Sequence, residues 1–267
     1  MTLTARGRVL LGAAVGFVLV VIYVPLLVVA VSSFNSDQTF GWPPSSLTLH
    51  WWRLAVHNQG ALDAIRTSVE VGLVATAVAL LLGTLAAFAL VRYDFFGRDS
   101  ISLLIILPIA LPGIVTGLAL NSAFTTMMGV GLSIWTVAVA HATFCIVVVF
   151  NNVSARLRQI GGNVEEASMD LGASRWTTFR LVTLPLLRLV LLAGALLAFA
   201  LSFDEIVVTT FTAGNGVQTL PIWIFANLFR PNQTPVINVI GTVLILVSLV
   251  PIYFSQKLVG SSGGGRL

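Results

Sequence analysis

The sequence consists mainly of long apolar runs that contain few charged residues. Six runs each reach about 20 residues, the length of helix that crosses the hydrocarbon of a bilayer; they are 9–32, 68–91, 100–127, 133–153, 188–211 and 235–257. Because 57% of the residues are apolar and only 9% are charged, the chain could not cover its own surface in water. No run alternates polar and apolar residues as the strands of a membrane barrel do. The sequence therefore predicts an all-α membrane protein with six transmembrane helices.

The basic residues are concentrated on one side of this predicted arrangement. With the N-terminus in the cytoplasm, the inner segments hold eleven of the 14 Lys and Arg residues and the outer segments hold three. Such an excess is typical of cytoplasmic segments. We therefore expect a multi-pass protein of the bacterial inner membrane, surrounded by lipid, with both termini in the cytoplasm. The basic residues form short clusters and no continuous basic face, which excludes a nucleic-acid partner.

The third apolar run contains two prolines, Pro108 and Pro112, and Gly113 follows the second of them. Proline has no backbone N–H, and its ring collides with the carbonyl one helical turn earlier. Sharp kinks in helices usually lie at such residues. The third span is therefore expected to be bent or broken.

The longest inner segment, 154–187, has the sequence pattern of a helix, a sharp turn and a second helix. Asn163 and Glu166 have the spacing of a capping box at the start of a short helix. Gly172 is the residue expected where the chain must take the left-handed conformation that ends a helix. A second helical stretch over 174–181 follows. We expect both helices to lie along the cytoplasmic face of the membrane.

The same segment resembles the EAA loop of ABC importer permeases, in which E-A-A is followed by three residues, G, nine residues and I-x-L-P. In this chain the pattern is filled by Glu166-Ala167-Ser168, Gly172 and Val182-Thr183-Leu184-Pro185. Two positions depart from it, Ser168 for the third alanine position and Val182 for isoleucine. The resemblance extends over nearly the whole chain. It implies a type I importer permease with one transmembrane domain over 1–267, a core at about 66–257 and a coupling loop at about 154–187.

The resemblance also implies partners and a division of labour. In that family a short helix of the loop docks on an ATPase subunit, so the implied coupling residues are Glu166, Ala167, Ser168, Gly172, Leu184 and Pro185. A Walker A loop needs a lysine after a glycine-rich turn, and the sole lysine, Lys257, follows none. We expect ATP and Mg to bind the ATPase and no cofactor to bind this chain. The implied partners are a PotB-like second permease, a PotA-like ATPase dimer and a PotD-like extracytoplasmic binding protein.

Three carboxylates lie inside or at the edge of the apolar runs: Glu70, Asp204 and Glu205. An ionised carboxylate within a membrane costs about 2.5–3.5 kcal/mol on insertion scales. No Lys or Arg lies in the interior of these runs to pair with them. The missing counter-charge is either a cationic substrate, such as an elongated amine, or else a proton, trapped water or an arginine of a partner subunit. Charge alone leaves both interpretations open.

The residues around the second and third carboxylates resemble the spermidine/putrescine branch of the permease family. The resemblance is carried by residues 201–211, LSFDEIVVTTF, and by Thr219-Leu220-Pro221-Ile222. It implies a polyamine substrate and a substrate pathway that includes Phe203, Asp204, Glu205 and Glu70. Permeases for other small organic solutes, such as aminoalkylphosphonates, share parts of this pattern and are the alternative.

Three other classes of protein are less compatible with the sequence. A secondary transporter also uses intramembrane carboxylates, but it would show an inverted repeat and would not need the EAA loop. An intramembrane enzyme would need catalytic residues, and the sequence offers no suitable ones. His50 and His57 fall in an outer segment, and His141 is alone in the fourth run. No H-E-x-x-H or G-x-S-x-G motif occurs. A purely structural subunit would not need the loop either. We therefore expect neither catalytic residues nor a metal site.

Overall fold

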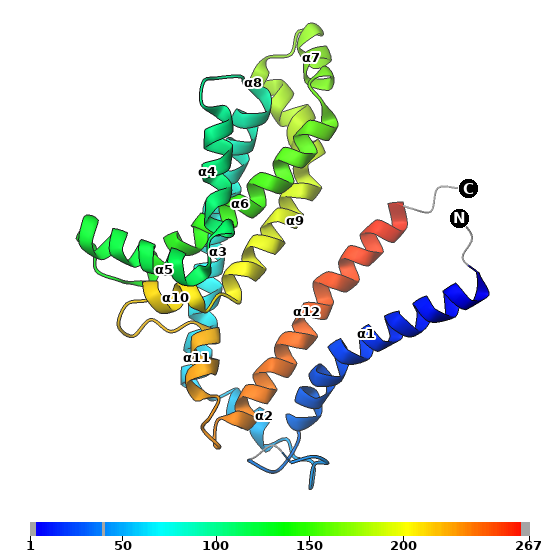
Figure 1. Cartoon of the computed structure of the whole chain (residues 1–267), viewed down its shortest axis with the longest axis vertical. Helices are drawn as coiled ribbons and strands as arrows, with labels where there is room; N and C mark the ends of the chain where they lie inside the picture. The colour runs from blue at the N-terminus through cyan, green and yellow to red at the C-terminus, as the bar shows by residue number, and fades with distance from the viewer. Residues whose placement is uncertain (1–3, 39–40, 263–267) are drawn as a thin grey trace. The chain divides into compact units, whose positions relative to one another are not determined.

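The computed structural model describes residues 4–38 and 41–262, and for Ala5 and residues 249–262 it describes the backbone alone. Within these residues the regular structure is helical (Figure 1). The α-helices are α1 (Ala5–Ser32), α2 (His50–Ala55), α3 (Gln59–Arg92), α4 (Arg98–Ala110), α5 (Gly113–Ser122), α6 (Ile134–Ile160), α7 (Asn163–Asp170), α8 (Arg175–Thr178), α9 (Leu184–Phe203), α10 (Val207–Thr212), α11 (Leu220–Asn227) and α12 (Thr234–Ser262). Two π-helical turns are η1 (Ala123–Met127) and η2 (Phe179–Thr183). The predicted all-α class is confirmed.

The long helices match the apolar runs. In the described part of the chain, four helices are long and apolar enough to cross a membrane: α1, α3, α6 and the continuous stretch Arg175–Phe203. A fifth is obtained if α4, α5 and η1 together count as one bent span. The sixth predicted run falls within α12, of which the stretch Thr234–Ser248 is apolar but shorter than a span.

The chain forms two compact units, one of Met1–Leu62 with Ile224–Leu267 and the other of Asp63–Trp223. The single permease domain expected from the sequence stays a prediction. In the first unit α1 and α2 pack against α12. Trp51 of α2 is buried there, and its indole N–H donates to the backbone oxygen of Asn35 at 2.8 Å.

The second unit is built around α6, which packs against α3, α4 and α9. Small residues on α3 let the helix backbones approach closely, as is common where helices pack inside membranes. A Cβ atom on Gly83 would lie 2.9 Å from the backbone oxygen of Ile146 in α6. The buried residues of α3 on this side recur every four positions; they are Ala75, Ala79, Gly83 and Ala87.

The third span is broken as the prolines predict. The α4 and α5–η1 helices meet at an angle of 108°, and Figure 1 shows α5 running sideways from the end of α4. Leu111 between them is extended, with φ −83° and ψ 145°, the conformation favoured before a proline. After the break, α5 packs against α10, where a Cβ on Gly117 would lie 2.7 Å from the ring of Phe211.

The fifth span differs from the predicted run over 188–211. Its helix ends at Phe203, eight residues before the predicted boundary, and the chain restarts as the short α10 at Val207. The other end also differs, because α8, η2 and α9 form one continuous stretch. The second helix of the predicted loop is therefore the beginning of the fifth span.

Candidate functional site

The first candidate region is the α7 helix, which carries the EAA residues. Its N-cap is Gly162, and no side chain caps the helix. The predicted capping box of Asn163 and Glu166 is therefore wrong, since Asn163 is already the first helical residue. The predicted end is confirmed: Gly172 has φ +92°, and its N–H donates to the oxygen of Met169 at 2.9 Å. A side chain at this left-handed position would be strained.

The turn after Gly172 fixes α7 against the start of the fifth span. The hydroxyl of Ser174 accepts the N–H of Thr177 at 3.2 Å and caps α8. The hydroxyls of Ser168 and Thr178 lie 3.0 Å apart. Serine at the third EAA position thus adds a contact between α7 and α8 that alanine could not make.

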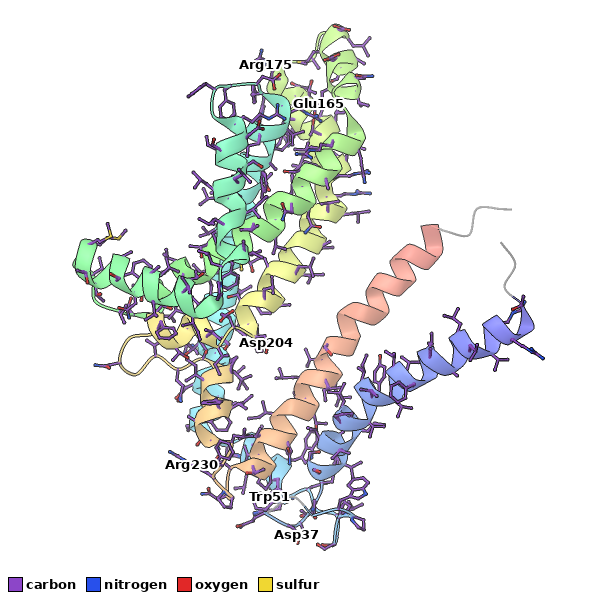
Figure 2. The ribbon with its side chains drawn as sticks, viewed as in Figure 1. Asp37, Trp51, Glu165, Arg175, Asp204 and Arg230 are labelled. Carbon is purple, nitrogen blue, oxygen red and sulfur yellow. The ribbon has the colours of Figure 1, made fainter. Side chains whose placement is uncertain are left out.

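The implied coupling residues fall into two groups. Glu166 and Ala167 are exposed on α7, and the neighbouring apolar side chains Leu171 and Trp176 are 91% and 69% exposed. Leu184 and Pro185 instead begin α9. A cleft of about 360 Å³ adjoins α7 and is lined by Phe88, Arg92, Tyr93, Gly162, Glu165, Glu166, Met169, Arg175, Thr178, Phe179 and Thr183. Figure 2 shows Glu165 and Arg175 at this end of the second unit.

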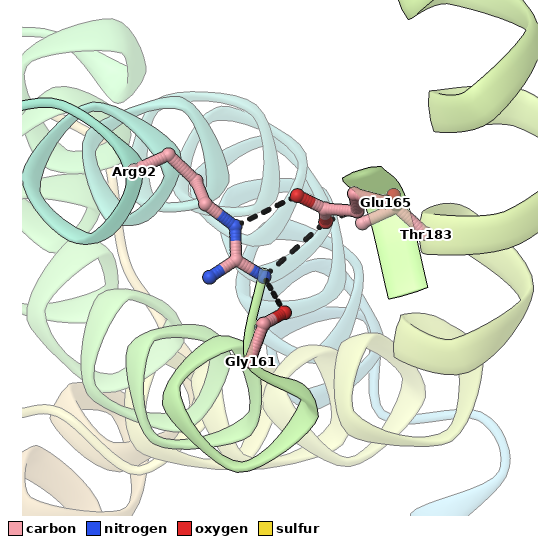
Figure 3. A network of polar contacts seen from close by, with 4 residues as sticks. All are labelled: Arg92, Gly161, Glu165 and Thr183. Atoms are coloured by element: carbon pink, nitrogen blue, oxygen red, sulfur yellow. Dashed lines mark hydrogen bonds and ion pairs between the residues drawn. The ribbon is translucent and has the colours of Figure 1, made fainter. Parts of the chain in front are cut away.

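An ion pair that the sequence analysis missed lies beside this cleft (Figure 3). The Nε atom of Arg92, the last residue of α3, is 2.9 Å from Oε2 of Glu165 in the first turn of α7. The Nη2 atom of Arg92 donates to the backbone oxygen of Gly161 at 2.9 Å and to Glu165 Oε1 at 3.2 Å. Thr183 donates its hydroxyl to the same Oε1 at 3.0 Å. We call these four residues the Arg92–Glu165 network.

The second candidate region is the break between α9 and α10, residues 204–206, which holds both carboxylates of the fifth span. Asp204 is exposed (Figure 2), and within the described part of its unit its carboxylate makes no hydrogen bond or ion pair. It follows the C-terminus of α9, where unpaired carbonyls give a partial negative charge. Glu205 differs, because its Oε1 accepts the N–H of Val208 at 2.9 Å. The two acidic residues therefore have different surroundings.

His141 of α6 holds the two sides of the break together. Its Nδ1 lies 2.7 Å from the hydroxyl of Ser202 in α9, and its Nε2 lies 2.8 Å from the hydroxyl of Thr209 in α10. Thr209 donates its one hydroxyl proton to the backbone oxygen of Glu205 at 2.8 Å. This assigns the proton of the imidazole to Nε2, as donor to Thr209, and makes Nδ1 the acceptor from Ser202. The lone histidine of the fourth run is thus a fully buried support for the break.

Glu70 is not gathered with the other acidic residues. Its Oε1 pairs with Nε of Arg66, one turn earlier on α3, at 2.7 Å. Arg66 lies just outside the predicted run, so the counter-charge that was expected to be missing is present for Glu70. It lines a separate cavity of about 240 Å³ with Val71, Val74, Ile134, Trp135 and Ala138. Phe203 remains next to Asp204 at the end of α9 and packs on Phe199, with ring centroids 5.8 Å apart.

Known proteins resemble this chain in sequence and in fold. The family described as binding-protein-dependent transport system inner membrane component matches residues 79–262. The spermidine/putrescine transport system permease protein PotC of Escherichia coli (strain K12) is 33% identical over 252 residues, 94% of each chain. A candidate 2-aminoethylphosphonate transport system permease protein, PhnV of Salmonella typhimurium (strain LT2), is 34% identical over 229 residues, 85% of this chain and 86% of PhnV.

The fold is also that of a solved importer. The crystal structure of a bacterial ABC transporter involved in the import of the acidic polysaccharide alginate matches with a TM-score of 0.70 and 15% identity. The match covers 98% of this chain and 99% of the other chain.

Proposed function

This chain belongs to the binding-protein-dependent transport system inner membrane components and is a permease subunit of an ABC importer, and we propose that its substrate is a polyamine such as spermidine or putrescine. It is a multi-pass protein of the inner membrane. The observation that carries the substrate proposal is Asp204, an exposed carboxylate at the break of the fifth span.

The proposal for the substrate rests on charge. Asp204 adds a full negative charge beside the negative end of α9, and no basic side chain of the described part of its unit pairs with it. A cation near a helix C-terminus is stabilised by the helix dipole as well as by the carboxylate. An ammonium group of an extended amine supplies that charge. Glu205, which accepts a backbone N–H, shapes the break, and Glu70 with its partner Arg66 contributes less.

We place the N- and C-termini in the cytoplasm, in line with the distribution of Lys and Arg along the sequence. The α7 helix then faces the cytoplasm, where it docks on the ATPase. Exposed Glu166 offers a carboxylate to a basic group, and Leu171 and Trp176 offer apolar surface. Aromatic side chains are enriched in protein interfaces, and polar side chains are usual at their rims.

The complete importer then contains four kinds of chain. A PotB-like permease pairs with this one, two PotA-like ATPase subunits bind ATP and Mg, and a PotD-like protein delivers the substrate from outside. The energy for transport comes from ATP on the ATPase subunits. This chain contributes half of the pathway and the contact that links it to hydrolysis.

The experiment is a ligand panel on the complete importer reconstituted in proteoliposomes with its binding protein. We expect spermidine or putrescine to stimulate ATP hydrolysis, and Asp204→Asn to weaken that stimulation while the complex still assembles. Stimulation by 2-aminoethylphosphonate alone would assign the substrate to the alternative class. Substrate uptake that proceeds without ATP, driven by a proton or sodium gradient, would make the chain a secondary transporter.

A further inference from the structure

The carboxylate of Glu165 joins segments that are far apart in the sequence. Its partners are Arg92, at the end of the second span, and Thr183, in the η2 turn near the beginning of the fifth span. Arg92 in turn binds the backbone oxygen of Gly161, at the end of the fourth span. One side chain of α7 is therefore tied to the ends of three membrane-spanning helices, as Figure 3 shows.

The charges in this network are placed where the helix dipoles favour them. Glu165 lies in the first turn of α7, where a negative charge is stabilised, and Arg92 binds a carbonyl at the C-terminus of α6, where a positive charge is stabilised. The side chains of Arg92 and Glu165 are 17% and 16% exposed. Removing one partner would leave a largely buried charge without its counter-ion, which is a costly state.

We propose that Arg92 and Glu165 are positioning residues that make α7 and the ends of the second, fourth and fifth spans move together. The side-chain carboxylate of Glu166, the next residue, is exposed and makes no hydrogen bond or ion pair with a described residue. Glu165 therefore connects α7 to the membrane-spanning helices, and Glu166 is available to bind the ATPase. The inference rests on the proposed docking of the ATPase on α7 but not on the identity of the substrate.

The test measures whether a nucleotide on the ATPase changes the fifth span. Thr210→Cys, at an exposed position of α10 just after the break, in a Cys145→Ser background gives this chain a single thiol, and a membrane-impermeant maleimide reports its accessibility in the complete importer, with and without ATP plus vanadate. With the network intact, we expect ATP plus vanadate to change the labelling rate. With Glu165→Gln the buried ion pair is lost, and we expect the nucleotide-driven change in labelling to shrink by about fivefold. The rate of ATP hydrolysis and the amount of bound ATPase should stay within about twofold of the parent.

Two further variants separate a linking role from a general structural one. Asp94→Asn removes the exposed pair between Asp94 and Arg98, two residues from Arg92, and should leave the change in labelling intact. Thr183→Val removes only the hydroxyl bond to Glu165 and should reduce the change by about twofold. If the importer with Glu165→Gln does not assemble, the change in labelling of the Thr183→Val importer decides between a linking role and a general structural role.

The double variant Arg92→Gln with Glu165→Gln provides a coupling test. Because each single variant already breaks the same ion pair, the double variant should lose no more of the nucleotide-driven change in labelling than Glu165→Gln alone does. A nucleotide-driven change that is equal in Glu165→Gln and the parent, or in Thr183→Val and the parent, would overturn the inference. No change in labelling even with the network intact would overturn the proposed function and, with it, this inference.

Discussion

The chain carries two adjacent acidic pairs, Glu165–Glu166 in α7 and Asp204–Glu205 at the break of the fifth span. In each pair one carboxylate is bound within the chain and the other is exposed. The carboxylate of Glu165 binds Arg92 and Thr183, whereas the carboxylate of Glu205 accepts the N–H of Val208, three residues on. The first bond connects distant helices, and the second shapes one local turn.

This difference separates two uses of the same residue type. A carboxylate that pairs across a long sequence separation fixes how whole helices are placed, and its loss is felt at a distance. A carboxylate that accepts a neighbouring N–H fixes a local conformation, and an amide oxygen can replace it. The exposed member of each pair, Glu166 or Asp204, is then free to bind another molecule. Four comparisons of variants test this assignment, in order of decreasing expected effect.

The comparison within the second pair should give the largest effect. Asp204→Asn should raise the KM for spermidine uptake by about 10- to 100-fold, because a bond between charged groups contributes about 1.5–3 kcal/mol. Glu205→Gln keeps an oxygen that can accept the N–H of Val208, so its KM should change by at most about threefold. Uptake of spermidine into proteoliposomes that contain the complete importer measures both KM values. Equal effects of the two substitutions would contradict the distinction.

The support of the break by His141 should matter next. His141→Phe keeps a ring in the core but leaves the buried hydroxyls of Ser202 and Thr209 without their partner, at a cost of about 1–3 kcal/mol. We expect the KM for spermidine to rise by about tenfold with a smaller change in maximal rate. Thr143→Val is the matched control, since the Thr143 hydroxyl bonds only within α6. If uptake by His141→Phe fell only in proportion to the amount of importer in the membrane, with KM unchanged, His141 would have no specific role at the break.

The turn that ends α7 tests the first pair through its backbone. Gly172→Ala places a Cβ at φ +92°, which costs about 1 kcal/mol or more, and should reduce ATP-driven uptake by about fivefold. The same exchange at Gly97, which also has a positive φ and no neighbour within 4 Å, should affect uptake little. Similar losses for both glycines would mean that the effect is one of stability alone.

The smallest effect is expected at the exposed member of the first pair. An exposed ion pair contributes about 0.2–1 kcal/mol, so Glu166→Gln should weaken binding of the ATPase subunit by about threefold. Copurification at increasing salt measures this, and the difference from the parent should shrink as salt screens the charge. Asp99→Asn, an exposed acidic residue on α4, serves as control. If Glu166→Gln and the parent bind the ATPase equally well at low salt, Glu166 does not lie in the interface.

Features of the structure that depend on local chemistry could be predicted from the sequence. The apolar runs located the long helices, Pro108 and Pro112 together indicated that the third span is broken, and Gly172 located the end of α7. Each depends on residues within a few positions, whose backbone preferences act without help from the rest of the fold. The predicted capping box is also a local feature, but it was wrong. Gly162 competes with Asn163 for the cap position, and the sequence does not decide between them.

Features that depend on distant partners could not be predicted. No proline or glycine marks the end of α9, and apolar residues resume at Ile206 after the two carboxylates, so the predicted fifth span ran on to residue 211. What holds that break is His141, more than 60 positions earlier in the chain. The bond from Arg92 to Glu165 likewise spans 73 positions. A basic residue at the end of one span and an acidic residue in the first turn of α7 were the available signals.

The π-helical turn η2 sets the rotational phase of the fifth span. Thr178 and Thr183 both contact α7, through Ser168 and Glu165, although residues five apart lie about 140° from each other around an α-helix. Bonds from residue i to i+5, such as that between Phe179 oxygen and Leu184 N–H, add one residue to the turn and bring such positions toward the same side. Deleting one residue from η2 would leave the composition of the span almost unchanged but would turn one of the two threonines away from α7.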